Sequence, residues 1–81
     1  MAILNVTYGG RSADLPGTLD DATDDADVKR IAAEVMRAGG MPGLRVRDLP
    51  SGAFRHFVID RITDRDGVLR FYLRPKVPFG Q

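Results

Sequence analysis

The chain has 81 residues, of which 28% are charged, a net charge of +1 and no cysteine. This length fits one small domain, and the lack of cysteine excludes a disulfide, a thiolate nucleophile and a cysteine-ligated zinc ion. We expect a cytoplasmic protein, because residues 1–6 lack the basic start of a signal peptide and no segment approaches the ~20 apolar residues of a membrane span.

Residues 2–15 predict a β-hairpin. Hydrophobic and polar residues alternate over residues 2–8, which is the period of a strand with one buried face. Gly9-Gly10 predicts a two-residue turn, because such turns need positive φ angles that glycine adopts freely. Residues 11–15 then return antiparallel, and Pro16 ends the pairing because it lacks an N–H donor. The side chains expected to face the core are Leu4, Val6, Tyr8, Ala13 and Leu15.

A helix is predicted over Val28–Ala38, where apolar residues recur at helical spacing. In the acidic stretch before it, either Thr23 or Asp24 can cap the first turn. That stretch does not predict a calcium-binding loop, because the alternating acids, the central glycine and the closing glutamate are missing. Gly39 is expected to end the helix in the left-handed conformation. The apolar stripe consists of Val28, Ile31, Ala32 and Val35.

Three strand segments are predicted after the helix, at residues 44–47, 53–63 and 68–74. Asp64–Gly67 is expected to form the hairpin turn between the last two. The segment 53–63 carries apolar residues at both parities. It therefore contains a bulge, buries both faces or exposes an apolar patch.

The last predicted strand also alternates apolar and polar side chains. Leu69, Phe71 and Leu73 are expected to face inward, and the residues between them outward. The prolines that follow cannot continue a hydrogen-bonded ladder. We therefore expect a domain of residues 1–74 and a flexible C-terminal tail of residues 75–81.

The order of these elements resembles that of ubiquitin. The similar segments are Leu4-Asn5-Val6 with its glycine turn, Asp24–Pro42 with its capped helix, and Val68–Arg74 as the last strand before a tail. The resemblance implies an α+β fold of the ubiquitin-like β-grasp type, with an N-terminal β-hairpin, one helix and then two or three strands in a mixed sheet whose centre is the last strand. The Asp64–Gly67 hairpin departs from ubiquitin and leaves the strand order open. The alanine-, arginine- and aspartate-rich composition suggests that bacterial ubiquitin-like proteins are the nearer comparison.

The tail departs further from the ubiquitin pattern. Ubiquitin-type modifiers end in Gly-Gly, which lets an extended chain enter the narrow channel where its carboxylate is adenylated. Here Phe79 stands at the first glycine position and Gln81 follows Gly80. The resemblance implies a modifier joined to target proteins through Gly80, after a peptidase removes Gln81 or Gln81 is chemically converted. Its partners would be that peptidase, E1-like and E2-like enzymes and the targets, and Lys29 and Lys76 are candidate acceptor lysines for a second copy.

The outward residues of the last strand form a candidate partner-binding surface. Tyr72 is flanked by Arg70 and Arg74, and Val58 and His56 are expected nearby. Tyrosine and arginine are residue types that anchor protein interfaces. An ordinary solvated sheet face with one exposed aromatic ring explains the same residues as well.

No catalytic constellation is recognisable. His56 is the only histidine and Glu34 the only glutamate, so neither a metal site nor a nucleophile–base pair can be assembled. We expect no enzymatic activity and no cofactor. The alternative to a modifier is a β-grasp adaptor or assembly subunit of a bacterial secretion or defence system that is never conjugated, with Val77 and Phe79 docking to a partner or to a neighbouring copy. No membrane is expected as a partner, because no segment is apolar enough to span one. A third, weaker interpretation makes the arginine-bearing sheet a nucleic-acid platform, but the net charge of +1 is far below a basic binding footprint.

Overall fold

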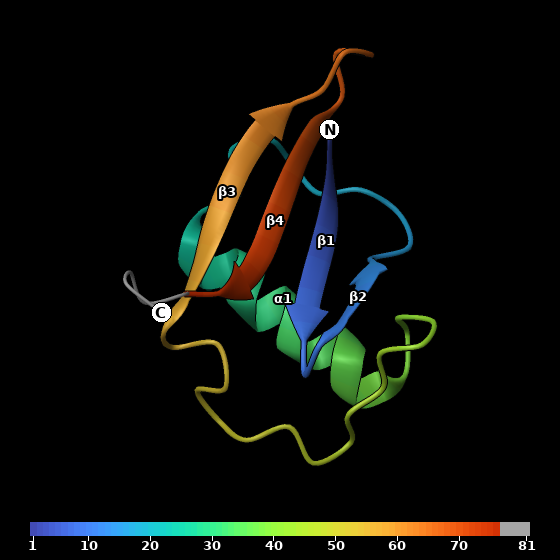
Figure 1. Ribbon diagram of the computed structural model, residues 1–81, viewed down its shortest axis with the longest axis vertical. Helices are drawn as coiled ribbons and strands as arrows, with labels where there is room; N and C mark the ends of the chain where they lie inside the picture. Colours follow the sequence, from blue (N-terminus) through green and yellow to red (C-terminus); the bar gives the residue numbers. More distant parts are fainter. Residues whose placement is uncertain (77–81) are drawn as a thin grey trace.

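The computed structural model describes residues 1–76, and these form a four-stranded sheet crossed on one side by a helix (Figure 1). The strands lie in the order β2-β1-β4-β3. β1 and β4 are parallel, whereas β2 pairs with β1 and β3 pairs with β4 in antiparallel fashion. This is the predicted β-grasp-like α+β fold, with two strands after the helix and the last strand inside the sheet. The elements are β1 (Ala2–Tyr8), β2 (Arg11–Asp14), α1 (Asp25–Ala38), β3 (Phe57–Thr63) and β4 (Leu69–Pro75).

The N-terminal hairpin is confirmed. Gly9 and Gly10 have φ angles of 58° and 79°, which match the left-handed conformation that the tight turn requires. Tyr8 pairs with Arg11 directly across the turn. The second strand ends at Asp14, one residue earlier than predicted, although the pairing continues through a single hydrogen bond to Leu4 from the next N–H.

The helix begins at Asp25, three residues before its predicted start. Asp24 is the cap, because its carboxylate accepts a hydrogen bond from the Asp27 N–H at 2.9 Å. The Thr23 hydroxyl instead donates to the Asp20 carbonyl at 2.6 Å. At the other end Gly39 has a φ of 77° and terminates the helix as predicted. Between residues 1 and 76 no helix is long and apolar enough to cross a membrane.

The predicted strand at residues 44–47 is wrong, and the strand predicted from residue 53 begins only at Phe57. Residues 50–57 contain successive tight turns, each closed by an N–H to a carbonyl three residues earlier. The Val46 N–H donates at 3.3 Å to the Met36 carbonyl at the end of α1, so its segment is held against the helix and not against a strand. Alternation alone predicted a strand here, but the apolar residues contact the core from an irregular loop.

The start of β3 resolves the mixed pattern of residues 53–63. Phe54 precedes the strand and is buried in the core, where its ring contacts those of Tyr8 and Phe57 with centroid distances of 5.9 and 4.9 Å. Within the strand, only Val58 and Ile62 place apolar side chains on the side away from α1. On this side Ile62 is 52% exposed and Val58 is half-buried, so the strand leaves apolar side chains partly open to solvent.

The core is a single layer between α1 and the sheet. β4 lies between β1 and β3, and the helix covers it, so its inward side chains are enclosed on every side (Figure 1). Phe71 is the largest of these fully buried side chains. The side chains with no exposed surface are Ala2, Leu4, Val6, Val28, Ala32, Met36, Phe71 and Leu73.

Arg61 connects the sheet to the start of the helix. It lies opposite Phe71 in the β3–β4 pairing, and its guanidinium carbon is 4.6 Å from the centroid of that ring. The same group donates to the Asp25 carboxylate and to the Thr23 carbonyl, both at 2.7 Å. A cation over an aromatic face, hydrogen-bonded to a second element, fixes where α1 begins above the sheet.

Replacing Phe71 by alanine should lower the free energy of unfolding by about 3–5 kcal/mol, because a buried phenylalanine is replaced by a cavity. The matched control is Ile62→Ala on the exposed side of the sheet, for which we expect a change within about 0.5 kcal/mol. Urea denaturation followed by circular dichroism measures both. Equal losses in the two variants would contradict the central position of β4.

Candidate protein-binding face

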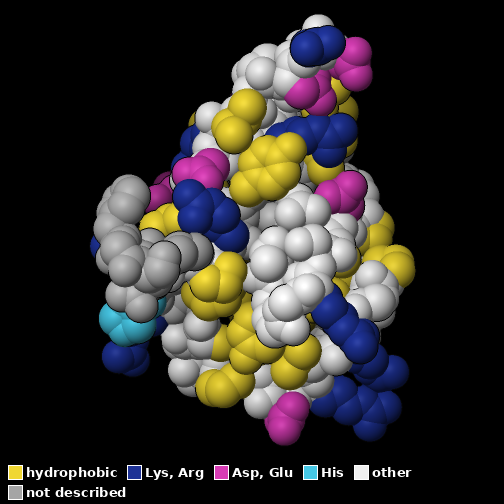
Figure 2. Space-filling view, in the orientation of Figure 1, with side chains coloured by type: hydrophobic (Ala, Val, Ile, Leu, Met, Phe, Trp, Pro, Cys, Tyr) yellow, Lys and Arg dark blue, Asp and Glu magenta, His cyan; other side chains and the backbone are white. Residues whose placement is uncertain are grey.

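The side of the sheet opposite α1 is open, and we call it the open face. Because side chains alternate along a strand, it is built from the residues between the buried ones. Figure 2 shows this face, with hydrophobic side chains interspersed among basic and acidic ones. Its members are Ile3, Asn5 and Thr7 from β1, Ser12 and Asp14 from β2, Val58, Asp60 and Ile62 from β3, and Arg70, Tyr72 and Arg74 from β4.

Tyr72 lies at the centre of this face. It is paired with Asn5 on one side and with Asp60 on the other. It is half-buried by these neighbours and by the arginines two positions before and after it in β4. A tyrosine in this setting presents a rigid ring with a polar hydroxyl, which suits a protein contact.

The two arginines beside Tyr72 are both paired with acids. Arg74 Nε donates to Asp60 Oδ2 at 2.6 Å, and Arg70 Nε donates to Asp64 Oδ2 at 3.0 Å. The arginine-bearing strand predicted from the sequence therefore presents ion pairs and not free cations. A partner of this face would meet a nearly neutral surface with an apolar margin.

Asp64 organises the β3–β4 turn as well as binding Arg70. One of its carboxylate oxygens accepts hydrogen bonds from the N–H groups of Asp66 and Val68, at 2.9 and 3.1 Å. The Arg70 guanidinium, followed by the Val68 N–H, holds the pKa of the Asp64 carboxyl below its ordinary value of 3.8. The same contact raises the pKa of Arg70. The ionised carboxylate is thus part of the folded turn.

The structure brings together four of the five residues predicted for the partner-binding surface. Arg70, Tyr72, Arg74 and Val58 share the open face, and Val58 lies directly opposite Arg74. His56 does not join them, because it lies in the turn before β3 and no strand pairing orients it. The chain at residues 53–56 had been expected to be extended, and its turns remove His56 from the sheet.

Two apolar residues of the open face were not predicted as part of the surface. Ile3 and Ile62 lie on either side of Arg70 in one row across the sheet. The parity of residues 2–8 could have identified Ile3, because it alternates with the buried Ala2 and Leu4. That Ile3 and Ile62 flank Arg70 could not be predicted without the strand order, which places β1 and β3 on opposite sides of β4.

β4 ends at one end of the sheet. Pro75, expected in the tail, is the last residue of the strand and pairs with Phe57. Pro75 and Lys76 are exposed, at the same end of the sheet as the Gly9-Gly10 turn (Figure 1). The predicted conjugation residues Phe79, Gly80 and Gln81 lie outside the described residues. The other candidate acceptor, Lys29, lies half-buried on α1 behind the sheet.

Within residues 1–76, no group of three or more histidine, aspartate and glutamate side chains is placed to hold a metal ion. In the same part of the chain, every buried side-chain nitrogen or oxygen has a hydrogen-bond partner. The open face itself presents an aromatic ring, apolar side chains and paired charges. No protein-family model, curated protein or solved structure matches the chain.

Replacing Asp64 by asparagine should destabilise the protein at neutral pH. In acid, the difference in stability between wild type and variant should be smaller. A carboxyl whose pKa is lowered by folding contributes stability above its unfolded pKa, and that contribution is lost as the pH falls through the folded pKa. Wild type and variant should therefore differ in melting temperature at pH 7 and converge below about pH 4. The control is Asp66→Asn, since the Asp66 side chain makes no hydrogen bond among the described residues. A pH-independent difference would contradict the role of the Asp64 charge.

Proposed function

We propose that the protein is a ubiquitin-like modifier of bacterial type, attached to other proteins through Gly80. The observation that carries the proposal is the position of β4. It is an interior strand parallel to β1, so the chain leaves the middle of the sheet at one end, where Pro75 and Lys76 are exposed. A last strand held in the middle of the sheet, with exposed residues at its end, suits a protein whose C-terminal residues enter the active site of another enzyme.

The proposed reaction needs Gly80 as a free carboxylate. A peptidase adds water across the Gly80–Gln81 amide and releases glutamine. An E1-like enzyme then transfers AMP from ATP to the Gly80 carboxylate with release of pyrophosphate. A cysteine thiolate of the E1-like or E2-like enzyme displaces AMP to form a thioester, and a target lysine amine displaces the thiolate to form the isopeptide bond.

The open face is the proposed recognition surface for these enzymes. Tyr72 lies in the interior of the sheet, two residues from Arg74 and close to the exit of the chain. Central aromatic residues surrounded by polar groups are typical hot spots of protein interfaces. The ion pairs on both sides of Tyr72 keep its ring in place and reduce the cost of ordering long arginine side chains on binding.

The second candidate function is an adaptor that is never conjugated. Phe79 favours it, because a phenylalanine occupies the position where ubiquitin-type modifiers have the first of two glycines. In that function Val77 and Phe79 dock to a partner or to a neighbouring copy. The two functions make opposite demands on Gly80, which is essential to the first and dispensable to the second.

Three forms of the C-terminus test the proposal. Epitope-tagged protein is incubated with ATP and a lysate of the source cells, and adducts are detected by immunoblot and intact mass. We expect adducts with the full chain, equal or faster adduct formation when Gln81 is deleted, and none when Gly80 and Gln81 are both deleted. Adducts that persist without Gly80 would overturn the attachment site, and a full chain without adducts would favour the adaptor.

Replacing Tyr72 by alanine should reduce adduct formation about tenfold or more without unfolding the domain, because a central tyrosine of an interface is typically worth 2 kcal/mol or more. The control is Thr7→Ala at the margin of the same face, where little change is expected. The initial rate of adduct formation and the melting temperature are measured together. Equal rates for the two variants would assign enzyme recognition to another surface.

A further inference from the structure

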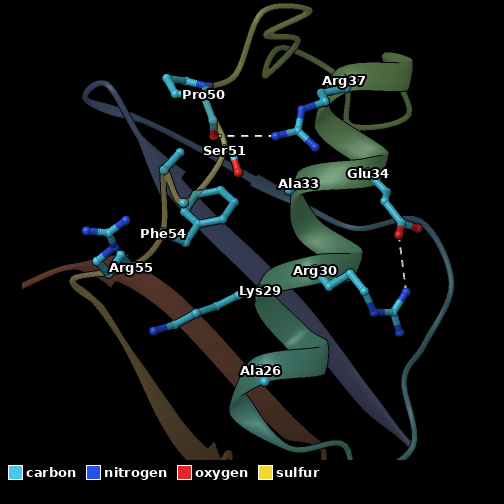
Figure 3. Close-up of a pocket in the computed structure, with 12 residues that line it drawn as sticks. Ala26, Lys29, Arg30, Ala33, Glu34, Arg37, Pro50, Ser51, Phe54 and Arg55 are labelled. Atoms are coloured by element: carbon cyan, nitrogen blue, oxygen red, sulfur yellow. Dashed lines mark hydrogen bonds and ion pairs between the residues drawn. The ribbon is translucent and has the colours of Figure 1, made fainter.

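A groove of about 340 Å³ lies on the side of the molecule opposite the open face, between α1 and the loop before β3. We call it the α1 groove. Figure 3 shows the helix along one side and residues 50–55 along the other. Small side chains line it, among them Ala33 from the helix and Ala53 from the loop. The groove therefore lets a chain approach the helix closely.

The loop side of the groove is preformed. The Arg37 guanidinium donates from Nε and Nη2 to the Leu49 carbonyl, at 3.1 and 3.0 Å, and from Nη2 to the Pro50 carbonyl at 3.4 Å. The adjacent Phe54 is buried and anchors the loop in the core. A site that needs no rearrangement loses less free energy when it binds a ligand.

The lining of the groove is strongly basic for a protein of net charge +1. Four basic residues line it, and Glu34 is the one acid among the described lining residues. Glu34 accepts a hydrogen bond from Arg30 Nη1 at 3.2 Å, and Figure 3 shows this pair directed away from the loop. Among residues 1–76, no ion pair or side-chain hydrogen bond engages Lys29 or Arg55.

The open cations come from both sides of the groove. Lys29 extends from the helix toward the side from which Arg55 comes (Figure 3). Arg37 also keeps its charge, because its partners in the loop are neutral carbonyls, and it is separated from Lys29 along the helix by about 12 Å, from the rise of ~1.5 Å per residue. An extended peptide covers this length with about four residues at ~3.3 Å each. Cations distributed over such a length match several carboxylates of one chain better than a single small anion.

We infer that the α1 groove binds an acidic, extended segment of a partner protein. Its carboxylates contact Lys29 and Arg55, and its backbone lies over the small side chains between the helix and the loop. The charge complementarity selects the partner, because acidic segments are attracted to this surface and basic ones repelled. The open face, whose arginines are paired with acids, lacks this selectivity. The inference is independent of conjugation, because the lining residues that it uses lie between Ala26 and Arg55 and include none of those proposed for attachment through the C-terminus.

The test measures binding of a fluorescein-labelled peptide of eight residues in which glutamate and alanine alternate. Fluorescence anisotropy should show saturable binding that weakens with added salt, and no binding of the matching lysine–alanine peptide. The double variant Lys29→Glu/Arg55→Glu should lose about tenfold or more in affinity. The matched control, Arg11→Glu/Arg65→Glu, carries the same change in charge at exposed positions away from the groove and should bind like the wild type.

Nuclear magnetic resonance locates the site and distinguishes the alternatives. Peptide-induced chemical-shift changes should map to residues 26–37 and 50–55. The double variants should have nearly the same melting temperature as the wild type. Shifts on the open face, equal affinity losses in the two double variants, or tighter binding of a single-stranded oligonucleotide to the same residues would each overturn the inference. Adduct formation is measured in parallel with the C-terminal deletions, which leave Lys29 and Arg55 in place, so failure of peptide binding is distinct from failure of the proposed modifier function.

Discussion

The burial of β4 in the middle of the sheet is the constraint on which the rest of the structure depends. Phe71 and Leu73 have no exposed surface, because strands flank β4 on both sides and α1 covers it. Parallel pairing of β1 and β4 requires a long crossover between the two ends of the sheet. The helix is part of that connection, and the same element closes the core. The parallel pairing of β1 and β4 and the burial of β4 therefore depend on the same helix.

Two arginines attach α1 at its ends. Arg61 reaches from β3 to the residues around the helix start, with its guanidinium over the Phe71 ring. Arg37 reaches from the last turn of the helix to the carbonyls of Leu49 and Pro50. The first contact sets how the helix lies on the sheet, and the second holds the loop that forms the α1 groove. Guanidinium groups suit both tasks, since their donors lie in a rigid plane.

The two surfaces of the protein differ in how their charges are used. On the open face, the acids Asp60 and Asp64 neutralise the arginines on either side of Tyr72. In the α1 groove, Lys29 and Arg55 make no ion pair among residues 1–76, and we propose that an acidic segment of a partner neutralises them. A small domain with two such surfaces can bind one partner through apolar and aromatic contacts and another through charge.

Most of the fold follows from local patterns. The glycine turn, the capped helix and the alternation in the last strand are each decided by a few neighbouring residues, and all three are confirmed. The segment at residues 44–47 shows where such reasoning fails. Its alternation is real, but a strand also needs a partner at its edge, and the chain there contacts the end of the helix instead.

The sites were less predictable than the fold. Arg70, Tyr72 and Arg74 could be placed on one face because alternation within a strand is a local property. The acids that neutralise those arginines, the meeting of Ile3 with Arg70, and the contact of Arg61 with Phe71 all join residues distant along the chain. Local chemistry sets turns, caps and the side of a strand on which a residue lies. Which residues then meet depends on strand order and packing, because the core must be enclosed by the whole chain at once.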